Sequence, residues 1–459
     1  MCKPLTKAVA SLLVSAALQV SGAVAEPPLK PNVILMMADD LGYGDISCNG
    51  STVNRTPVLD QLAKEGIRLT DYHSGSTVCT PSRMALLTGC HPTRVGWPGG
   101  VLGYKMMMTS GLATEARTIA EVFKDAGYST ALFGKWHLGD APDRLPHAQG
   151  FERAYYIKSS NNQTDEIWEN DKLVEKPFDN RLLTEQFTDQ AISFIRGNHD
   201  RPFFIYLPFT APHFPVQAHP GWKGKSKNAA FGDVVEEMDT RIGEIMETLR
   251  KLNIERHTLV LFTSDNGPQQ GYKNFTTAEP YRGDKWTPLE GGTRVPFIAH
   301  WPGVIRPGQV SDDLVSAVDL LPTLAHAADI SLEPGDFKPQ LDGIQAWDTF
   351  LGKRDEKHPP RQELLLWNGW ATPQAIRVGK WKLYFDEVKE IAGSETGPIL
   401  FKLEDDLKES ENIAAQHPDK VTEMRALARK KLESIAADSI PLGGGPEVPV
   451  VPPAPRWLR

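Results

Sequence analysis

Cysteine is scarce in this chain, which has four cysteines in 459 residues, at positions 2, 48, 79 and 90. Its fold must therefore rest on a packed core. With 40% hydrophobic and 24% charged residues, the composition is that of an ordinary globular protein that can bury such a core. The length is long for one domain and short for three.

Long hydrophobic runs are absent from the body of the chain. The one such run, residues 8–20, follows two lysines and precedes Ala-Val-Ala at 23–25, which is the pattern of a secretory signal peptide with its cleavage site. An uncleaved membrane anchor is the alternative, but the run is too short to span a bilayer comfortably. We predict that residues 1–25 are a cleaved signal peptide, that the mature protein is secreted or periplasmic, and that it has no membrane span.

An excess of positive charge is also absent, since 50 lysines and arginines face 58 acidic residues, for a formal net charge of −8. An acidic body argues against general nucleic-acid binding, and we expect no nucleic-acid partner.

Cleavage after residue 25 would leave three cysteines. In an oxidising compartment an odd number leaves one thiol unpaired.

The segment Cys-Thr-Pro-Ser-Arg at 79–83 is the most informative stretch that is present. Pro81 suits the first turn of a helix and Gly89 its end, so the pattern predicts a short helix with Cys79 at its N-terminus. Free N–H groups there favour an anion, and Arg83 lies one turn further on the same face. A thiol beside a guanidinium is a candidate reactive site. The alternatives are a buried or disulfide-bonded cysteine and an ordinary surface arginine.

Oxygen ligands follow two apolar runs that are typical of buried parallel strands. Residues 32–38 end in Asp39-Asp40, and residues 257–263 are followed by Asp265-Asn266. Ligands collect at the carboxyl ends of strands in α/β sheets, and adjacent carboxylates repel each other unless a cation lies between them. Four oxygen donors indicate a site for a hard divalent cation. Helix-capping or turn aspartates are the alternative.

Cationic and titratable residues follow further predicted strands. Lys135 and His137 come after residues 127–134, and in an extended segment they would point the same way. His213 follows residues 203–209, and Lys285 lies five residues before a Glu-Gly-Gly. A structural histidine and surface lysines are the ordinary alternatives.

In order along the chain, these motifs are Asp-Asp, Cys-x-Pro-x-Arg, Lys-x-His, Pro-His, Asp-Asn and Lys before Glu-Gly-Gly. Together they resemble the type I, formylglycine-dependent sulfatases, which are arylsulfatase-like members of the alkaline phosphatase superfamily, over nearly the whole mature chain. The resemblance implies that a maturation enzyme oxidises Cys79 to formylglycine. It also implies a bound Ca²⁺, with Mg²⁺ as the less favoured ion. The implied metal ligands are Asp39, Asp40, Asp265, Asn266 and residue 79.

The resemblance further assigns roles in sulfate-ester hydrolysis. A hydroxyl of the hydrated aldehyde attacks sulfur, Arg83 fixes the hydrate, and Lys135 and Lys285 supply positive charge. His213, with Lys285, protonates the leaving alcohol, and His137 takes a proton from the second hydroxyl. The implied substrate-binding residues are Lys135, His213, Lys285 and Ser160, the last from a stretch, 151–175, that we predict to be irregular.

The resemblance implies an α/β fold with a large mixed, mostly parallel sheet sandwiched by helices. It predicts a catalytic domain at 26–355, a small C-terminal subdomain with an antiparallel sheet at 356–440, and a Pro/Gly-rich tail at 441–459. If Cys79 becomes an aldehyde, Cys48 and Cys90 are left to pair or to stay free, and both options remain open.

The implied function is sulfatase action on a small-molecule or oligosaccharide sulfate ester, with carbohydrates favoured and aryl sulfates included. The alternative within the superfamily is a phosphate monoester, phosphodiester or phosphonate hydrolase. Those with metal-only chemistry need more histidine and aspartate ligands and a serine or threonine nucleophile. A binding protein on a retired scaffold is disfavoured because no expected ligand is missing.

Overall fold

The computed structural model describes most of the chain, namely residues 1, 30–103, 105–106, 110–272, 274–353, 360–385, 387–391 and 397–441. The predicted signal peptide, the predicted domain boundary at 355 and nearly all of the predicted tail lie outside these residues, and they stay predictions. None of the helices in the described ranges combines the length and the apolar composition that a bilayer crossing requires.

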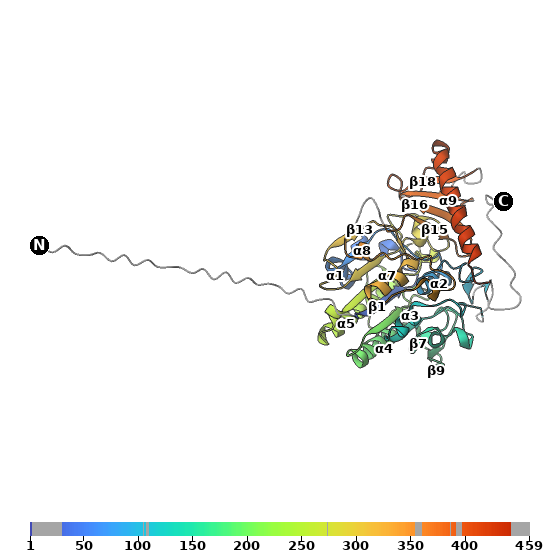
Figure 1. The fold of residues 1–459 in the computed structure, drawn as a ribbon. Coiled ribbons are helices and arrows are strands. Elements are labelled where there is room, and N and C mark those ends of the chain that lie inside the picture. Colours follow the sequence, from blue (N-terminus) through green and yellow to red (C-terminus); the bar gives the residue numbers. More distant parts are fainter. Residues whose placement is uncertain are drawn as a thin grey trace.

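A ten-stranded sheet forms the centre of the molecule (Figure 1). Its five middle strands, β11, β1, β10, β6 and β7, are parallel, whereas β12 and β8 run antiparallel to their neighbours. The order across the sheet is β13 (Gln309–Ser311), β2 (Ile67–Leu69), β12 (Phe297–His300), β11 (Thr258–Ser264), β1 (Asn32–Ala38), β10 (Phe203–Pro208), β6 (Ser129–Lys135), β7 (Arg153–Ile157), β8 (Ile167–Glu169) and β9 (Lys172–Glu175).

Helices cover both faces of this sheet because alternate side chains of each strand point to opposite faces. In β1, Leu35 belongs to an apolar cluster with α2 (Cys79–Thr88), α3 (Ile119–Asp125) and α7 (Leu320–Ala327). Its neighbour Ile34 belongs to the cluster with α1 (Pro57–Glu65), α4 (Leu183–Asn198) and α5 (Ala229–Lys251). A strand covered on both faces must be apolar throughout, which explains the continuous hydrophobic run that the sequence shows.

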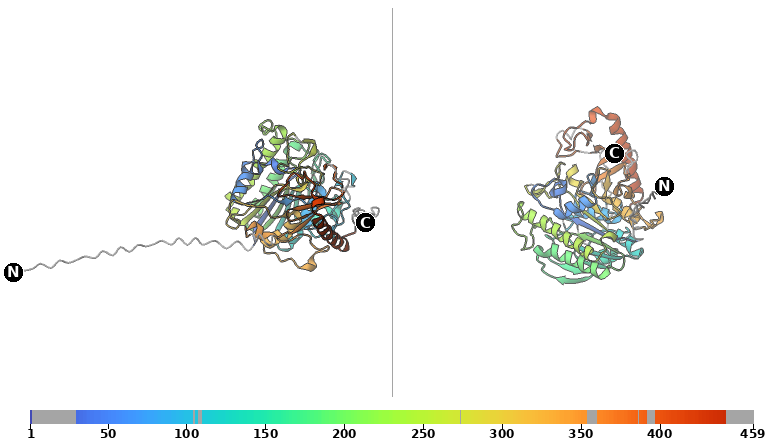
Figure 2. Two further views of the ribbon diagram at one scale, coloured as in Figure 1. Left: turned by 90° about the horizontal axis from the view of Figure 1, so that it is seen from above. Right: turned by 90° about the vertical axis from the view of Figure 1, so that its left-hand side faces the viewer.

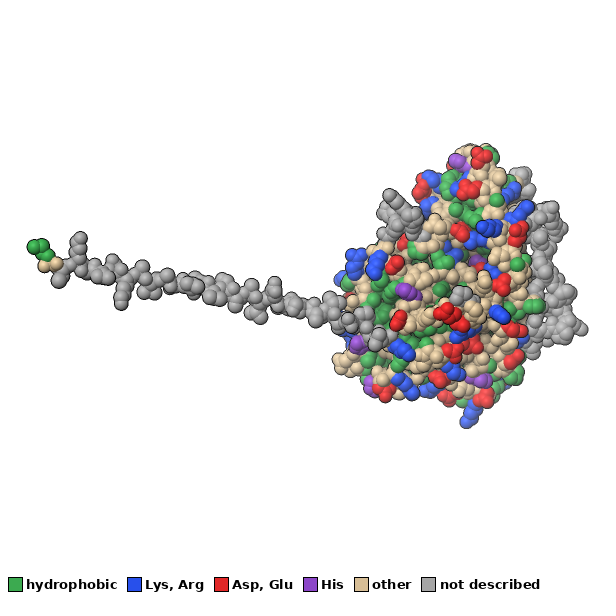
Figure 3. All heavy atoms as spheres, in the orientation of Figure 1, with side chains coloured by type: hydrophobic (Ala, Val, Ile, Leu, Met, Phe, Trp, Pro, Cys, Tyr) green, Lys and Arg blue, Asp and Glu red, His purple; other side chains and the backbone are tan. Residues whose placement is uncertain are grey.

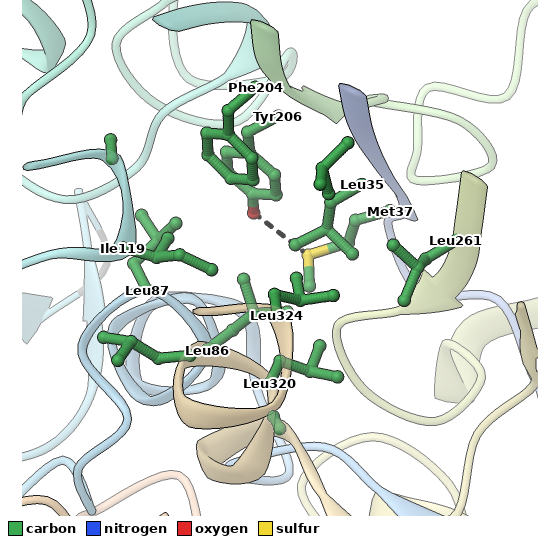
Figure 4. Close-up of a cluster of buried hydrophobic side chains, with 14 of the residues drawn as sticks. Leu35, Met37, Leu86, Leu87, Ile119, Phe204, Tyr206, Leu261, Leu320 and Leu324 are labelled. Atoms are coloured by element: carbon green, nitrogen blue, oxygen red, sulfur yellow. Dashed lines mark hydrogen bonds between the residues drawn. The ribbon is translucent and has the colours of Figure 1, made fainter. Parts of the chain in front are cut away.

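The helix that begins with Cys79 is anchored by its apolar end. Figure 4 shows Leu86 and Leu87 of α2 among side chains of β1, β10 and α7, and the Tyr206 hydroxyl there donates to the Met37 sulfur at 3.2 Å. This packing fixes the axis of α2. The N-terminus of α2 is thereby held at the edge of the sheet where the parallel strands end.

A second, four-stranded antiparallel sheet lies at one end of the molecule (Figure 2, right). It comprises β15 (Glu363–Trp367), β16 (Pro373–Val378), β17 (Trp381–Tyr384) and β18 (Ile399–Lys402). One face packs on α9 (Pro418–Ala437), and the other packs on Leu289 and Leu314 of the larger part. The predicted fold class is therefore confirmed.

One expectation is wrong. Residues 151–175 are not irregular, because β7 pairs with β6 and continues the sheet through β8 and β9. Of the two options left open for Cys48 and Cys90, the structure has the unpaired one, since both are free thiols. Cys48 packs in the cluster with α1, whereas Cys90 belongs to the cluster with α2 on the opposite face of the sheet.

We expect Leu86→Ala to lower the free energy of unfolding by about 2–5 kcal/mol, because it opens a cavity in fully buried packing. The matched control is Leu407→Ala, whose leucine is 39% exposed, and which should change stability by less than about 0.5 kcal/mol. Urea unfolding followed by circular dichroism measures both. Equal losses in the two variants would contradict the assigned packing.

Candidate active site

The two pairs of oxygen ligands meet because β1 and β11 pair in parallel with Ala38 opposite Ser264. The residues that follow are therefore neighbours, and the Asp40 N–H donates to Asp265 Oδ1 at 3.1 Å. The Asn266 amide donates to Asp40 Oδ1 at 2.7 Å. These side chains and that of Asp39 are buried, so their charge must be compensated inside the protein.

Cys79 is the first residue of α2, and it is buried beside this cluster. Burial raises the pKa of its thiol above the ordinary value, although Lys135 and Lys285 oppose the shift. The unmodified residue is therefore a neutral thiol at neutral pH, and a thiol is a poorer nucleophile than a thiolate.

Arg83 ties α2 to the strand ends. Its Nε and Nη2 donate to Asp265 Oδ2 at 3.0 and 2.7 Å, and its Nη1 donates to the backbone oxygen of Lys135 at 3.0 Å. One guanidinium thus fixes β11, β6 and the start of α2 relative to one another.

Two buried lysines neutralise the aspartate pair. Lys135 Nζ lies 2.6 Å from Asp39 Oδ2, and Lys285 Nζ lies 2.8 and 2.9 Å from the two oxygens of Asp40. Burial alone would raise the pKa of Asp39, but Lys135 and the other cations outweigh it and hold that pKa below its usual value. Burial would lower the pKa of Lys285, yet the carboxylates raise it. Asp39 and Lys285 are therefore held in their charged forms.

The cationic side chains of this site are buried. Figure 3 shows acidic and basic side chains interspersed over the face in view, whereas Arg83, Lys135 and Lys285 are all buried. The positive charge that the sequence suggested for an anionic substrate is thus concentrated inside the molecule.

The oxygen set fits a hard cation. Asp39 Oδ1 and Asn266 Oδ1 are buried and make no hydrogen bond within the described part of the chain, and Asp39, Asp40 and His213 bring ligand atoms within 4.8 Å of one another. Burial, followed by repulsion from Asp39, raises the pKa of Asp265 to about 7. A divalent cation among these oxygens would satisfy the unpaired atoms and relieve the repulsion.

His137 is placed differently from the extended geometry we expected. It has φ +59°, so it does not continue the β6 strand, and its Nε2 donates to the Leu102 carbonyl at 2.9 Å. That bond selects the tautomer with a lone pair on Nδ1, which is buried and unpaired among the described residues. Burial holds the pKa of His137 well below its usual value, so the ring is neutral.

His213 faces the same cluster, with Nε2 3.7 Å from Asp40 Oδ2. Its Nδ1 donates to the Phe214 carbonyl at 2.7 Å and lies 3.1 Å from Asn161 Oδ1. Burial lowers its pKa to about 4, against the pull of Asp39 and Asp40. Ser160 is buried, but the side chain that contacts His213 is that of Asn161, the residue after Ser160.

A second buried charge cluster lies outside the sequence prediction. Arg377 of β16 donates to Asp71 and Glu290 at 3.0 Å each, and Lys382 of β17 donates to Glu290 at 3.0 Å. Glu290 begins α6 (Glu290–Thr293), five residues after Lys285. The Glu-Gly-Gly motif could have pointed to it, but the partners come from the C-terminal sheet, which no local pattern links to residue 290.

The chain matches the family model described as Sulfatase over residues 31–330. It belongs to the sulfatase family. The curated relatives of this sulfatase include human arylsulfatase A, 34% identical with 90% of each chain covered. An N-acetylgalactosamine-6-O-sulfatase of Bacteroides thetaiotaomicron is 31% identical, with 88% of this chain and 93% of the relative covered.

Solved structures agree with this family. The PsFucS1 sulfatase from Pseudoalteromonas sp. superimposes with a TM-score of 0.81 at 27% identity, covering 90% of this chain and 92% of that one. A phosphonate monoester hydrolase of Agrobacterium radiobacter, at 19% identity and a TM-score of 0.62, shares the fold alone. The chain is therefore a sulfuric ester hydrolase on the fold that the sequence predicted.

We expect Lys382→Met to destabilise the protein by about 3–5 kcal/mol, because it leaves Glu290 buried without one of its cations. The control is Lys402→Met on β18, which removes two ion pairs of a lysine side chain that is 34% exposed, and which should change stability little. Thermal and urea unfolding compare the two variants. Similar small losses would show that the Glu290 cluster does not hold the two sheets together.

Proposed function

We propose that this sulfatase hydrolyses sulfate monoesters of carbohydrates, and aryl sulfates as well, with Cys79 matured to formylglycine and with Ca²⁺ as its metal. The observation that supports this best is the position of residue 79. It begins a buried helix beside two lysines and a set of unpaired oxygen ligands. An anionic ester, a nucleophile and a cation would meet at that point.

Asp39, Asp40, Asp265, Asn266 and residue 79 would hold the cation. These ligands are oxygens with no thiolate or imidazole among them once residue 79 is an aldehyde hydrate, and such a set favours Ca²⁺ or Mg²⁺ over Zn²⁺. When bound, the cation would neutralise sulfate oxygens and favour ionisation of a hydroxyl at position 79.

The aldehyde would supply two hydroxyls on hydration, one to attack sulfur and one to allow sulfate to leave. The chain's own residues handle the protons. Asp265, whose carboxylate Arg83 holds at 2.7 Å, is the proposed acceptor of the proton from the attacking hydroxyl. His137 offers the unpaired Nδ1 lone pair to take the proton of the second hydroxyl.

Lys135, Lys285 and Arg83 supply positive charge for the sulfate group. They are held by buried ion pairs before substrate arrives, so little reorganisation is needed at the moment of reaction. Substrate oxygens would share these donors with Asp39 and Asp40. Ser160 stays a proposed substrate contact from the loop that also carries Asn161.

Proton donation to the leaving alcohol falls to His213 and Lys285. The Nδ1 proton of His213 is committed to the Phe214 carbonyl, so Nε2 carries a proton only in the imidazolium form. A bound anion raises the pKa of His213 and so favours the imidazolium form.

The predicted signal peptide fits these assignments. The enzyme would act on substrates outside the cytoplasm after a formylglycine-generating enzyme has matured it.

Cys79→Ala and Cys79→Ser should each lose about 10³-fold or more in kcat toward para-nitrophenyl sulfate, because neither can become an aldehyde. Cys48→Ala is the control and should keep wild-type turnover, since Cys48 lies in a different cluster. Peptide mass spectrometry of active enzyme should find aldehyde at position 79. An unaltered thiol there with full activity would end the proposal.

Removal of divalent cations should abolish turnover of para-nitrophenyl sulfate, and Ca²⁺ should restore it better than Mg²⁺. A parallel assay with para-nitrophenyl phosphate tests the alternative phosphatase and phosphonate-hydrolase activities. Faster cleavage of the phosphate, or full sulfatase activity after chelation, would contradict the assignment.

A further inference from the structure

Two tryptophans, Trp286 and Trp370, form an aromatic wall that leads from the candidate active site to the surface. Trp286 follows Lys285 directly and packs in a small apolar cluster that contains Cys79. Trp370, from the turn between β15 and β16, lies against Trp286 with ring centroids 5.5 Å apart and planes 34° apart. Trp370 is 42% exposed. The chemistry described above uses neither indole.

Trp286, the tryptophan nearer to Cys79, has an unfavourable backbone conformation. Trp286 has φ +75°, in the left-handed region that a bulky residue rarely adopts. The backbone N–H of Trp286 donates at 3.0 Å to the Thr77 carbonyl, in the segment that leads into Cys79. Strain of this kind clusters at sites where it serves binding or catalysis.

The outer indole is mounted on a rigid turn. The Ser76 hydroxyl donates to the Asn368 carbonyl at 3.1 Å, and Asn368 Oδ1 accepts from the Trp370 N–H at 2.9 Å. A Cβ on Gly369 would lie 2.6 Å from the Trp286 ring, so the two indoles can approach only because residue 369 is glycine. The C-terminal sheet thus contributes a fixed aromatic residue to the site of the larger part, and Figure 1 shows that sheet above α2.

The chemistry of this wall points to a sugar. Leaving Trp370 42% exposed forgoes part of the stabilisation that burial would give it. A pyranose ring can cover exposed indole with its C–H groups while its hydroxyls stay hydrated, and two packed rings lose little conformational entropy on binding. The wall begins at residue 79, so a ring linked to a sulfate held there would lie along it.

We propose that Trp370, supported by Trp286, is a sugar-stacking platform that selects sulfated glycans over small sulfate esters. This inference rests on the proposed action on carbohydrate sulfates and adds the residue that favours them over small esters. Trp286 lies next to residue 79 and Trp370 one ring further out. An aryl sulfate fills the position near Trp286, whereas an oligosaccharide extends to Trp370.

The test compares Trp370→Ala with Trp370→Phe on two substrates, para-nitrophenyl sulfate and an oligosaccharide that ends in N-acetylgalactosamine 6-sulfate, with a carrageenan oligosaccharide as a second glycan. Trp370→Ala should raise KM for the preferred glycan about tenfold at little change in kcat. Trp370→Phe should restore most of the affinity, and neither variant should alter turnover of the aryl sulfate. An equal loss on the aryl sulfate, or no change on either glycan, overturns the platform.

Binding measured without turnover separates this inference from the proposed function. In a Cys79→Ala background, calorimetric titration with the same glycans should give a dissociation constant about tenfold weaker when Trp370 is also replaced by alanine. If the wild type cleaves no sulfate ester, the proposed function fails, and the titration still decides the platform. Unchanged affinity in the double variant overturns it.

Discussion

A balance of buried charges is the constraint on which this structure depends. Asp39, Asp40 and Asp265 are paired at short distance with Lys135, Lys285 and Arg83. An unpaired charge at any of these places would cost several kcal/mol, so each residue needs its partner. The six come from the ends of β1, β6 and β11, from α2 and from the loop before α6. The charge balance therefore holds only when the sheet and its helices are assembled.

The balance leaves a few atoms unpaired, and these are informative. Asp39 Oδ1, Asn266 Oδ1 and His137 Nδ1 are buried without a hydrogen-bond partner in the described part of the chain. Buried polar atoms are normally paired, so these three are available to a ligand. They belong to the residues at which we propose that a cation, a nucleophile and an anionic ester meet.

The C-terminal sheet contacts the segments that carry the candidate site residues. Arg377 and Lys382 reach from it to Glu290, just after the segment that carries Lys285. Burial alone would raise the pKa of Glu290, but these cations lower it, so the carboxylate stays charged between the two sheets. The turn with Trp370 is fastened to the segment before Cys79. In our proposals, the larger part carries the chemistry and the smaller part contributes to substrate choice.

Local patterns determined much of this protein. Continuous apolar runs predicted β1, β10 and β11, and Pro81 with Gly89 predicted α2, because hydrophobic periodicity and helix capping act over a few residues. The order of the motifs along the chain indicated the sulfatase family. The residue types in these motifs and the spacing between them are enough to indicate the chemistry.

Only the tertiary structure decided the remaining features, because each of them depends on contacts between residues far apart in the chain. The short strands β8 and β9 exist because β7 pairs with β6. Cys48 and Cys90 stay apart because the sheet separates them. The left-handed turn of His137, the cluster around Glu290 and the contact of Trp286 with Trp370 arise from packing between distant segments. The sequence by itself supplied the reactive groups, and long-range packing determined which of them meet.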